Sequence, residues 1–326
     1  MIGDAVAHKR IGDAVHQAFF TGIYIMKKKL AISLIIIIAL LAFAGCSSQN
    51  NEGADAAEAS MPSVTNMAGS TTASEVCNAL NDAGLSNVAV FNDWVLDFAD
   101  SAGKDSRLTD KWVQPGDNNP DLAACADGWE KHHDFSDADC RMTAMLLVDG
   151  LITAEKTDAE YTGTYLMFDV DAIENTDRYE VIRKNLGLFT TLFGDRALGE
   201  NEAPSEVYGN MWKEYGFSIS NENVSLVSLV FYDPDFRQTF TGHTGVLIKQ
   251  AEDKYLFVEK LAFEQPYQAI RVSDTDQLLD LLASREEYYG SEGEPGPYVY
   301  INGDYIGELR KGARHRQGRL TQRRLK

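Results

Sequence analysis

Apolar residues in the first half of the chain recur at helical spacing. Within residues 91–98, positions 91, 94, 95 and 98 are apolar and fall on one helical face. Ser74 is a favourable N-cap for a helix that ends near Gly84. The acidic turn around Asp139 precedes an apolar stretch, residues 141–148, which we expect to form a buried helix beginning at Cys140. Further helices are expected at residues 173–193, 207–215 and 276–284.

The second half changes to short apolar runs separated by polar turns, the pattern of strands. Strands are expected at residues 165–170, 224–232, 244–248, 255–259, 268–272 and 298–301. Helices followed by consecutive antiparallel strands are typical of the α+β class. We therefore predict a helical N-terminal half that packs on an antiparallel sheet.

Residues 26–45 have a different pattern. A basic start, Met26 followed by three lysines, leads into an apolar run from Leu30 to Ala44, with small residues after it. This is the pattern of a secretory signal. The run is shorter than the roughly 20 residues that a stable membrane span needs. Residues 1–25 precede a complete signal and contain a short internal repeat, so we expect the true start to be Met26.

The segment Phe43-Ala44-Gly45-Cys46 resembles the lipobox of bacterial lipoproteins, although Phe43 is bulkier than the usual leucine. In that family the signal is cut before the cysteine, whose thiol carries a diacylglycerol. The resemblance implies an extracytoplasmic protein that is anchored to the bacterial cell membrane by a lipid on Cys46. The alternative is an ordinary cleaved signal with a chance cysteine.

Composition divides the rest of the chain into three parts. Residues 46–73 are small and polar and are expected to form a disordered tether, residues 74–309 a single globular domain, and residues 310–326 a basic disordered tail. The chain has a net charge of −19. Setting aside five basic and two acidic residues in 1–45, and eight basic residues in 310–326, leaves 46–309 near −30. Such a domain repels nucleic acid, which we exclude as a partner.

The cysteine count draws attention to Cys140. With Cys46 as the anchor, Cys77, Cys125 and Cys140 leave an odd number outside the cell, where thiols are usually paired. A Cys77–Cys125 disulfide would leave Cys140 free, which is one pairing among those that the sequence allows. No Cys/His spacing of the zinc type occurs, and the sequence implies no metal and no cofactor.

Cys140, His243 and Glu259 are the candidate catalytic residues. Cys140 opens the expected helix, where the dipole and free N–H groups stabilise a thiolate, although neighbouring aspartates oppose this. His243 opens a strand, and a hairpin centred on residue 251 would place Glu259 opposite it. A carboxylate there would orient the imidazole. The alternatives are a Cys140 that is buried and unreactive or forms a disulfide, a structural histidine, and a Glu259 that pairs with Lys260, Arg271 or another base.

This order resembles the papain-like NlpC peptidases, in which a cysteine opens a helix, a histidine opens a strand and a polar residue follows on the next strand. The residues that carry the likeness are Asp139-Cys140-Arg141 and the stretch from His243 to Ile248. The spacing between cysteine and histidine is larger than usual for that family, and its third residue is often His or Asn. The resemblance implies a papain-like core and a peptide or peptidoglycan substrate.

A closer resemblance is to the bacterial lipoprotein family called domain of unknown function 4300. It rests on four stretches of sequence, which begin at Cys140, Phe240, Phe257 and Pro266. That family brings no established activity. We therefore expect a surface-anchored cysteine-dependent amidase or peptidase of the cell envelope. The alternative is a non-catalytic lipoprotein that recognises a peptide, a glycan or an envelope partner.

Overall fold

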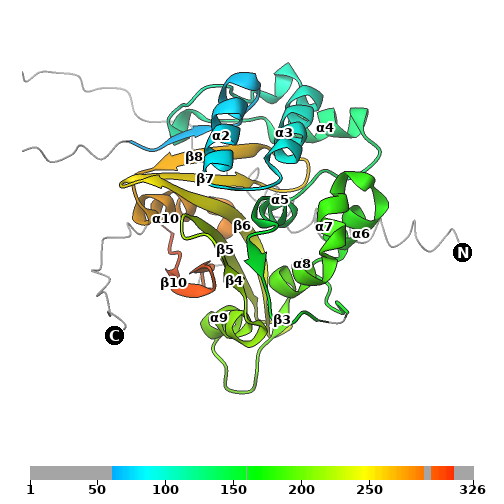
Figure 1. Ribbon diagram of the computed structural model, residues 1–326, viewed down its shortest axis with the longest axis vertical. Coiled ribbons are helices and arrows are strands. Elements are labelled where there is room, and N and C mark those ends of the chain that lie inside the picture. Colours follow the sequence, from blue (N-terminus) through cyan, green and yellow to red (C-terminus); the bar gives the residue numbers. More distant parts are fainter. Residues whose placement is uncertain (1–60, 159, 290–294, 312–326) are drawn as a thin grey trace, which may run out of the picture. The chain divides into compact units, whose positions relative to one another are not determined.

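The computed structural model describes residues 61–158, 160–289 and 295–311, which build one large antiparallel sheet with helices on both faces (Figure 1). The sheet has eight strands in the order β1-β8-β7-β6-β5-β9-β10, and β3 pairs with β6 beside this path. Its strands are β1 (Ser63–Thr65), β3 (Arg196–Ala197), β5 (Val224–Asp233), β6 (Gln238–Ala251), β7 (Lys254–Lys260), β8 (Tyr267–Val272), β9 (Tyr298–Ile301) and β10 (Asp304–Glu308). A separate two-stranded sheet joins β2 (Ile152–Thr153) and β4 (Ser218–Ile219).

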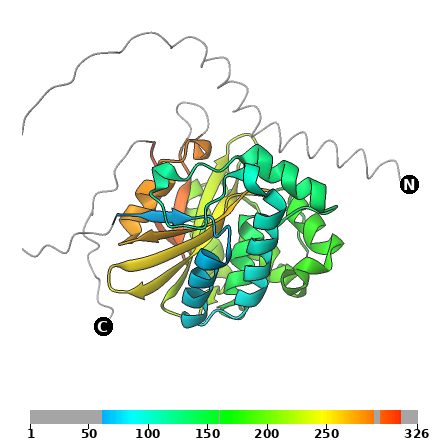
Figure 2. The ribbon, with the colours of Figure 1, turned by 90° about the horizontal axis from the view of Figure 1, so that it is seen from above.

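Most helices precede the sheet along the chain, which confirms the predicted α+β class. Figure 2 shows them on one side of the sheet, with α10 on the other side. The α-helices are α2 (Ser70–Asp82), α3 (Val88–Ala102), α4 (Leu122–His132), α5 (Cys140–Val148), α6 (Met167–Asn175), α7 (Glu180–Lys184), α8 (Leu186–Phe193), α9 (Pro204–Tyr215) and α10 (Thr275–Ala283). Short 3-10 turns lie at η1 (Lys104–Ser106), η2 (Pro115–Asp117), η3 (Asp177–Tyr179) and η4 (Glu286–Tyr288).

The two faces of the sheet belong to two hydrophobic cores. Successive side chains of a strand point to opposite faces, so Val246 of β6 packs with the N-terminal helices, while Leu247 packs with α10. In β7, Val258 and Phe257 divide in the same way. None of the helices in the described ranges is long and apolar enough to cross a membrane.

The folded region begins earlier than residue 74. β1 pairs with β8, and Val64 in it is buried. α2 begins at Ser70 and not at Ser74, because Gly69 is its N-cap and the N–H of Thr72 donates to a carboxylate of Asp110 at 2.8 Å. The expected tether boundary at residue 73 is therefore wrong. Val64 and Met67 are buried here, although small polar residues dominate the composition.

Residues 165–170 are not a strand, because most of them belong to α6 or the turn before it. A short apolar run does not by itself distinguish a strand from a buried helix. In α6 the buried side chains are Asp169, Ala172 and Ile173, which have helical spacing. The single helix expected at residues 173–193 is broken, because Thr176 is extended and caps η3 instead.

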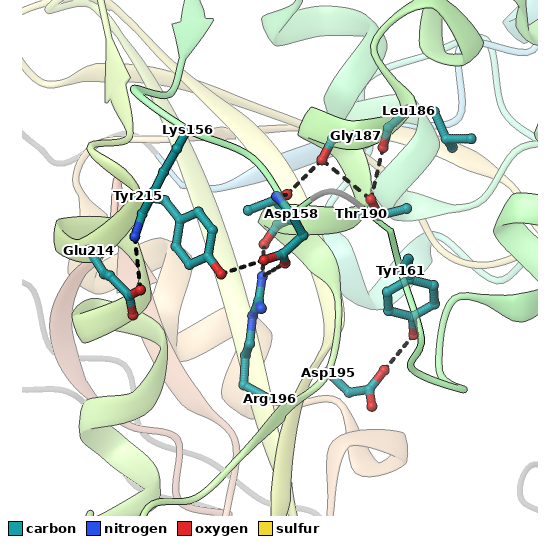
Figure 3. A network of polar contacts seen from close by, with 11 residues as sticks. Lys156, Asp158, Tyr161, Leu186, Gly187, Thr190, Asp195, Arg196, Glu214 and Tyr215 are labelled. Carbon is teal, nitrogen blue, oxygen red and sulfur yellow. Dashed lines mark hydrogen bonds and ion pairs between the residues drawn. The ribbon is translucent and has the colours of Figure 1, made fainter.

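A polar network fixes the segment after β2 against α8, β3 and α9 (Figure 3). Asp158 is its centre. The carboxylate of Asp158 pairs with Arg196 at 2.8 Å and accepts a hydrogen bond from the hydroxyl of Tyr215. The backbone N–H of Asp158 donates to the hydroxyl of Thr191 at 2.8 Å. At the edge of the network, Lys156 pairs with Glu214. Because these contacts join four separate elements, we interpret the network as a structural brace.

Candidate functional site

Cys140 is the first residue of α5, as the sequence predicted. Asp139 caps the helix, because its Oδ1 accepts a hydrogen bond from the N–H of Met142 at 2.9 Å. α5 is buried throughout its length and packs against β6 (Figure 1). The first N–H groups of a helix have no acceptor within it and favour negative charge. Those of α5 therefore lie where a charged sulfur or an oxyanion would be stabilised.

A buried ion cluster surrounds the start of α5. The guanidinium of Arg141 makes two bonds to Asp169, of 2.7 and 2.9 Å, and lies 2.7 Å from Asp139. It also donates to the carbonyl of Thr241 in β6 at 2.9 Å. Burial, with a smaller contribution from the neighbouring Asp169, raises the pKa of Asp139 to about 8 against the opposing effect of Arg141. One proton is thus retained near neutral pH, and the cluster carries little net charge.

The sequence did not predict the role of Arg141 or Asp169. Arg141 was available as a signal, because a lone charged residue inside an apolar helix is rarely buried without a partner. The two aspartates expected to oppose a thiolate are both paired with cations. Asp139 is paired with Arg141, and Asp137 lies 2.7 Å from the buried ammonium of Lys260.

His243 and Glu259 are in contact, as their hairpin predicted, but the register differs. Nε2 of His243 lies 2.6 Å from Oε2 of Glu259. Glu259 is opposite Gly245 in the ladder, because the turn lies at residues 252–253 rather than at 251. The two side chains are therefore diagonal neighbours on the face that packs with α10. Both are buried, with 2% and 1% of their surfaces exposed.

Glu259 has more partners than the sequence indicated. Arg285 donates to both of its carboxylate oxygens, at 2.9 Å to Oε2, and Gln268 donates to Oε1 at 2.5 Å. Burial opposes ionisation of Glu259, but the charge of Arg285 and then the bond from His243 outweigh it and hold its pKa well below the usual range. The alternative pairing of Glu259 with a base is thus also present, but the base is Arg285, because Lys260 and Arg271 bind Asp137 and Glu75.

The thiol of Cys140 lies beside the peptide bond that follows His243. The backbone N–H of Thr244 faces its sulfur and acts to lower the pKa of the thiol. Burial raises the pKa of Cys140 well above its usual value, and Asp139 adds to this, while Arg141 and the Thr244 N–H act in the opposite direction. Within the described residues, no hydrogen bond joins the thiol to the imidazole. The site therefore holds a neutral thiol against the backbone of β6, and a preformed His–Glu pair on the face of the sheet that packs with α10.

The site is closed to solvent. Cys140 is 4% exposed, and the ring of Tyr288 packs 5.5 Å from the ring of His243. Two surface cavities, of about 480 and 80 Å³, lie elsewhere, one beside Ala99 and the other beside Trp112, and neither is lined by Cys140, His243 or Glu259. Access to the thiol thus requires movement of the chain around it.

The other two cysteines do not form a disulfide. Cys77 and Cys125 are both free and buried, so the alternative of a Cys77–Cys125 bridge is wrong. Burial raises the pKa of each to about 11. In the part of the chain that the structure describes, no group of three or more His, Cys, Asp or Glu side chains has the arrangement of a metal site. The predicted anchor, Cys46, lies outside the described residues.

Comparison with known proteins gives one match. A family model described as Domain of unknown function (DUF4300) matches residues 63–306. No curated protein and no solved structure matches the chain. The matched region begins at β1 and ends within β10, so it contains nearly the whole sheet, α5 and the three candidate residues.

Proposed function

The chain belongs to the DUF4300 family, and we propose that it is a cysteine-dependent amidase or peptidase of the bacterial cell envelope. One observation carries the proposal. A buried His243–Glu259 pair, 2.6 Å apart, joins β7 to β6, the strand whose Thr244 N–H faces the sulfur of Cys140 at the start of a helix. The order along the chain, with a cysteine at the start of a helix, a histidine on a strand and an acid on the next strand, also resembles that of NlpC-type peptidases.

The tautomer of His243 follows from its partner. An ionised carboxylate only accepts hydrogen bonds, so Nε2 of His243 carries a proton and donates it to Glu259. In the neutral imidazole the lone pair is then on Nδ1, which has no hydrogen-bond partner among the described residues. Nδ1 is therefore the atom that would take the thiol proton.

The reaction would proceed through a thioester. Nδ1 of His243 takes the proton of Cys140 as the sulfur attacks the carbonyl carbon of an amide, and the N–H of Cys140 stabilises the oxyanion. The protonated imidazole then gives its proton to the departing amine as the C–N bond breaks. Water, deprotonated by His243, cleaves the thioester and restores the thiol. Glu259 orients the imidazole throughout.

The substrate class and location complete the proposal. A peptide or a peptidoglycan stem peptide contains the amide bond that this chemistry requires, and the acidic domain favours a cationic one. A lipid on Cys46 would hold the enzyme at the outer face of the membrane. Labelling cells with radioactive palmitate tests the anchor, because Cys46→Ala should abolish the label and Cys77→Ala should not.

A second function, non-catalytic recognition of a peptide, glycan or envelope partner, is favoured by the burial of Cys140 and His243. A thiol-directed electrophilic probe on the full-length protein in membranes separates the two functions. The hydrolase predicts labelling that disappears in Cys140→Ala and persists in Cys77→Ala, which removes the matched buried thiol. Absence of labelling in the native protein, with labelling only after denaturation, would instead support the binding function.

A further inference from the structure

Arg285 lies just after α10, at a distance of 26 positions from Glu259. Leu278 and Leu282 of α10 pack in the core on that face of the sheet, which places the end of the helix over β7. The side chain of Arg285 is 13% exposed, and that of Glu259 is fully covered. A guanidinium in this position forms two parallel bonds to a carboxylate, which fix direction as well as charge.

The carboxylate of Glu259 is saturated with donors. Its two oxygens offer about four acceptor sites. Oε1 accepts from Gln268 and Arg285, and Oε2 accepts from His243 and Arg285. Each oxygen thus accepts one hydrogen bond from a guanidinium nitrogen of Arg285 and one from a further donor. Only one orientation of the carboxylate satisfies all four bonds, and it is the orientation that meets Nε2 of His243.

We infer that Arg285 is a positioning residue, which fixes Glu259 against His243 and offsets part of the carboxylate charge that the imidazole meets. The inference rests on the proposed function for its effect on catalysis. The electrostatic effect of Arg285 on His243 depends only on the contacts of both residues with Glu259. A Glu259 without Arg285 would present its full charge to the imidazole and stabilise the imidazolium, which has no free lone pair to take the thiol proton.

The charged and polar groups around His243 support the expectation that loss of Arg285 favours the imidazolium. β7 contributes Glu259, and the segment after α10 contributes Arg285 and the hydroxyl-bearing ring of Tyr288, which receives a bond from Arg285 at 2.7 Å. On the side of α5 lie the neutral thiol of Cys140 and the nearly neutral cluster around Arg141. Arg285 is thus the principal cation facing the His–Glu pair among the described residues.

Titration of His243 in the full-length protein tests the inference. Proton NMR of the histidine ring, assigned with His243→Gln, should give a pKa of His243 that is higher by at least about one pH unit in Arg285→Gln. The acidic limb of the kcat profile should move to higher pH by the same amount, with KM nearly unchanged. Arg285→Lys keeps the positive charge but loses the two parallel hydrogen bonds to Glu259. It should therefore reduce kcat, and it should displace the acidic limb of the kcat profile less than Arg285→Gln does.

The matched control is Arg271→Gln, which removes an arginine–glutamate pair that is 40% and 49% exposed on the strand next to β7. It should leave the titration of His243 unchanged. An unchanged titration in Arg285→Gln overturns the inference. If that variant does not fold, an Arg285→Lys protein with native kcat and native pH profile overturns it equally. A displaced titration together with full activity in Cys140→Ala would refute the hydrolase and leave the inference standing.

Discussion

Two carboxylate clusters in this protein have nearly the same components and different surroundings. Glu259 binds Arg285, beside the hydroxyl of Tyr288, and Asp158 binds Arg196 and the hydroxyl of Tyr215 (Figure 3). The Glu259 side chain is fully buried, whereas that of Asp158 is 28% exposed. Only the buried cluster contains a histidine. Burial and the added histidine therefore separate a candidate site from a brace.

The difference follows from solvent screening. In a partly exposed pair such as Asp158–Arg196, water competes with the bonds, so the pair contributes about 1 kcal/mol or less. In a buried pair, removal of one partner leaves a charge without solvent, at a cost of about 3–5 kcal/mol. Removal of the charge of Arg285 should consequently alter the electrostatic environment of His243, whereas solvent should screen much of the effect of removing the charge of Arg196. The predictions below test this contrast, from the largest expected effect to the smallest.

The largest effect is expected on catalysis. Cys140→Ala should lower kcat for amide hydrolysis by about 10⁴-fold or more, because the attacking atom is lost. Asp158→Asn should keep kcat within about twofold of the native value, because its cluster touches no reacting group. Hydrolysis of a cationic peptide by the purified full-length protein measures both. Comparable losses in the two variants would show that the exposed cluster is also part of the site.

The next effect concerns stability. Glu259→Gln should lower the free energy of unfolding by about 3–5 kcal/mol, because Arg285 is left buried without its counter-charge. Asp158→Asn should lower it by less than about 1 kcal/mol. Urea denaturation followed by tryptophan fluorescence gives both values. Equal losses would contradict the assignment of the contrast to burial.

The pH dependence of stability is a smaller effect. The folded-state pKa of Asp139 is raised to about 8, so the folded protein retains a proton that the unfolded chain has lost. Stability should therefore fall as pH rises from about 4 to about 8. Asp139→Asn keeps the helix cap and should flatten this slope, as seen in urea midpoints at pH 5, 6.5 and 8. A slope as steep as that of the native protein would place the retained proton elsewhere.

The smallest effect is expected at the edge of the exposed network. Lys156 and Glu214 are 54% and 64% exposed and 3.0 Å apart. Lys156→Gln should change the free energy of unfolding by less than about 0.5 kcal/mol, and high salt should remove the difference. The cost of Glu259→Gln should persist in the same salt. A salt-sensitive Glu259 variant would mean that water reaches the His–Glu pair.

Much of the sheet could be predicted from the sequence, because turns bound its strands closely. The segment at residues 255–259 corresponds to β7, and 268–272 to β8, within one residue at each end. The contact between His243 and Glu259 was predicted despite a register error, because a hairpin brings its two strands together in either register. Local pattern was sufficient where the partners were close in sequence.

The rest required the tertiary structure. Arg285 meets Glu259 only because α10 crosses the sheet, and no local pattern encodes that crossing. Asp169 lay in a segment interpreted as a strand, so its bond with Arg141 was not predicted. β1 was missed because three residues in a small polar stretch carry too little pattern. The closure of the site over Cys140 was likewise not visible in the sequence.

The early start of the fold, at β1, would also set how a lipid-anchored form of the domain is attached. With a lipid on Cys46, residues 47–62 separate the anchor from the sheet, and these can span at most about 55 Å rather than the roughly 95 Å of a 27-residue tether. Tension on the anchor would arrive first at an edge strand, where Val64 is bonded to Val113 on one side and β1 pairs with β8 on the other. Strands β8 and β7 stand between that edge and the strand of His243. The force would thus act on β1, which two strands separate from the strand that carries His243.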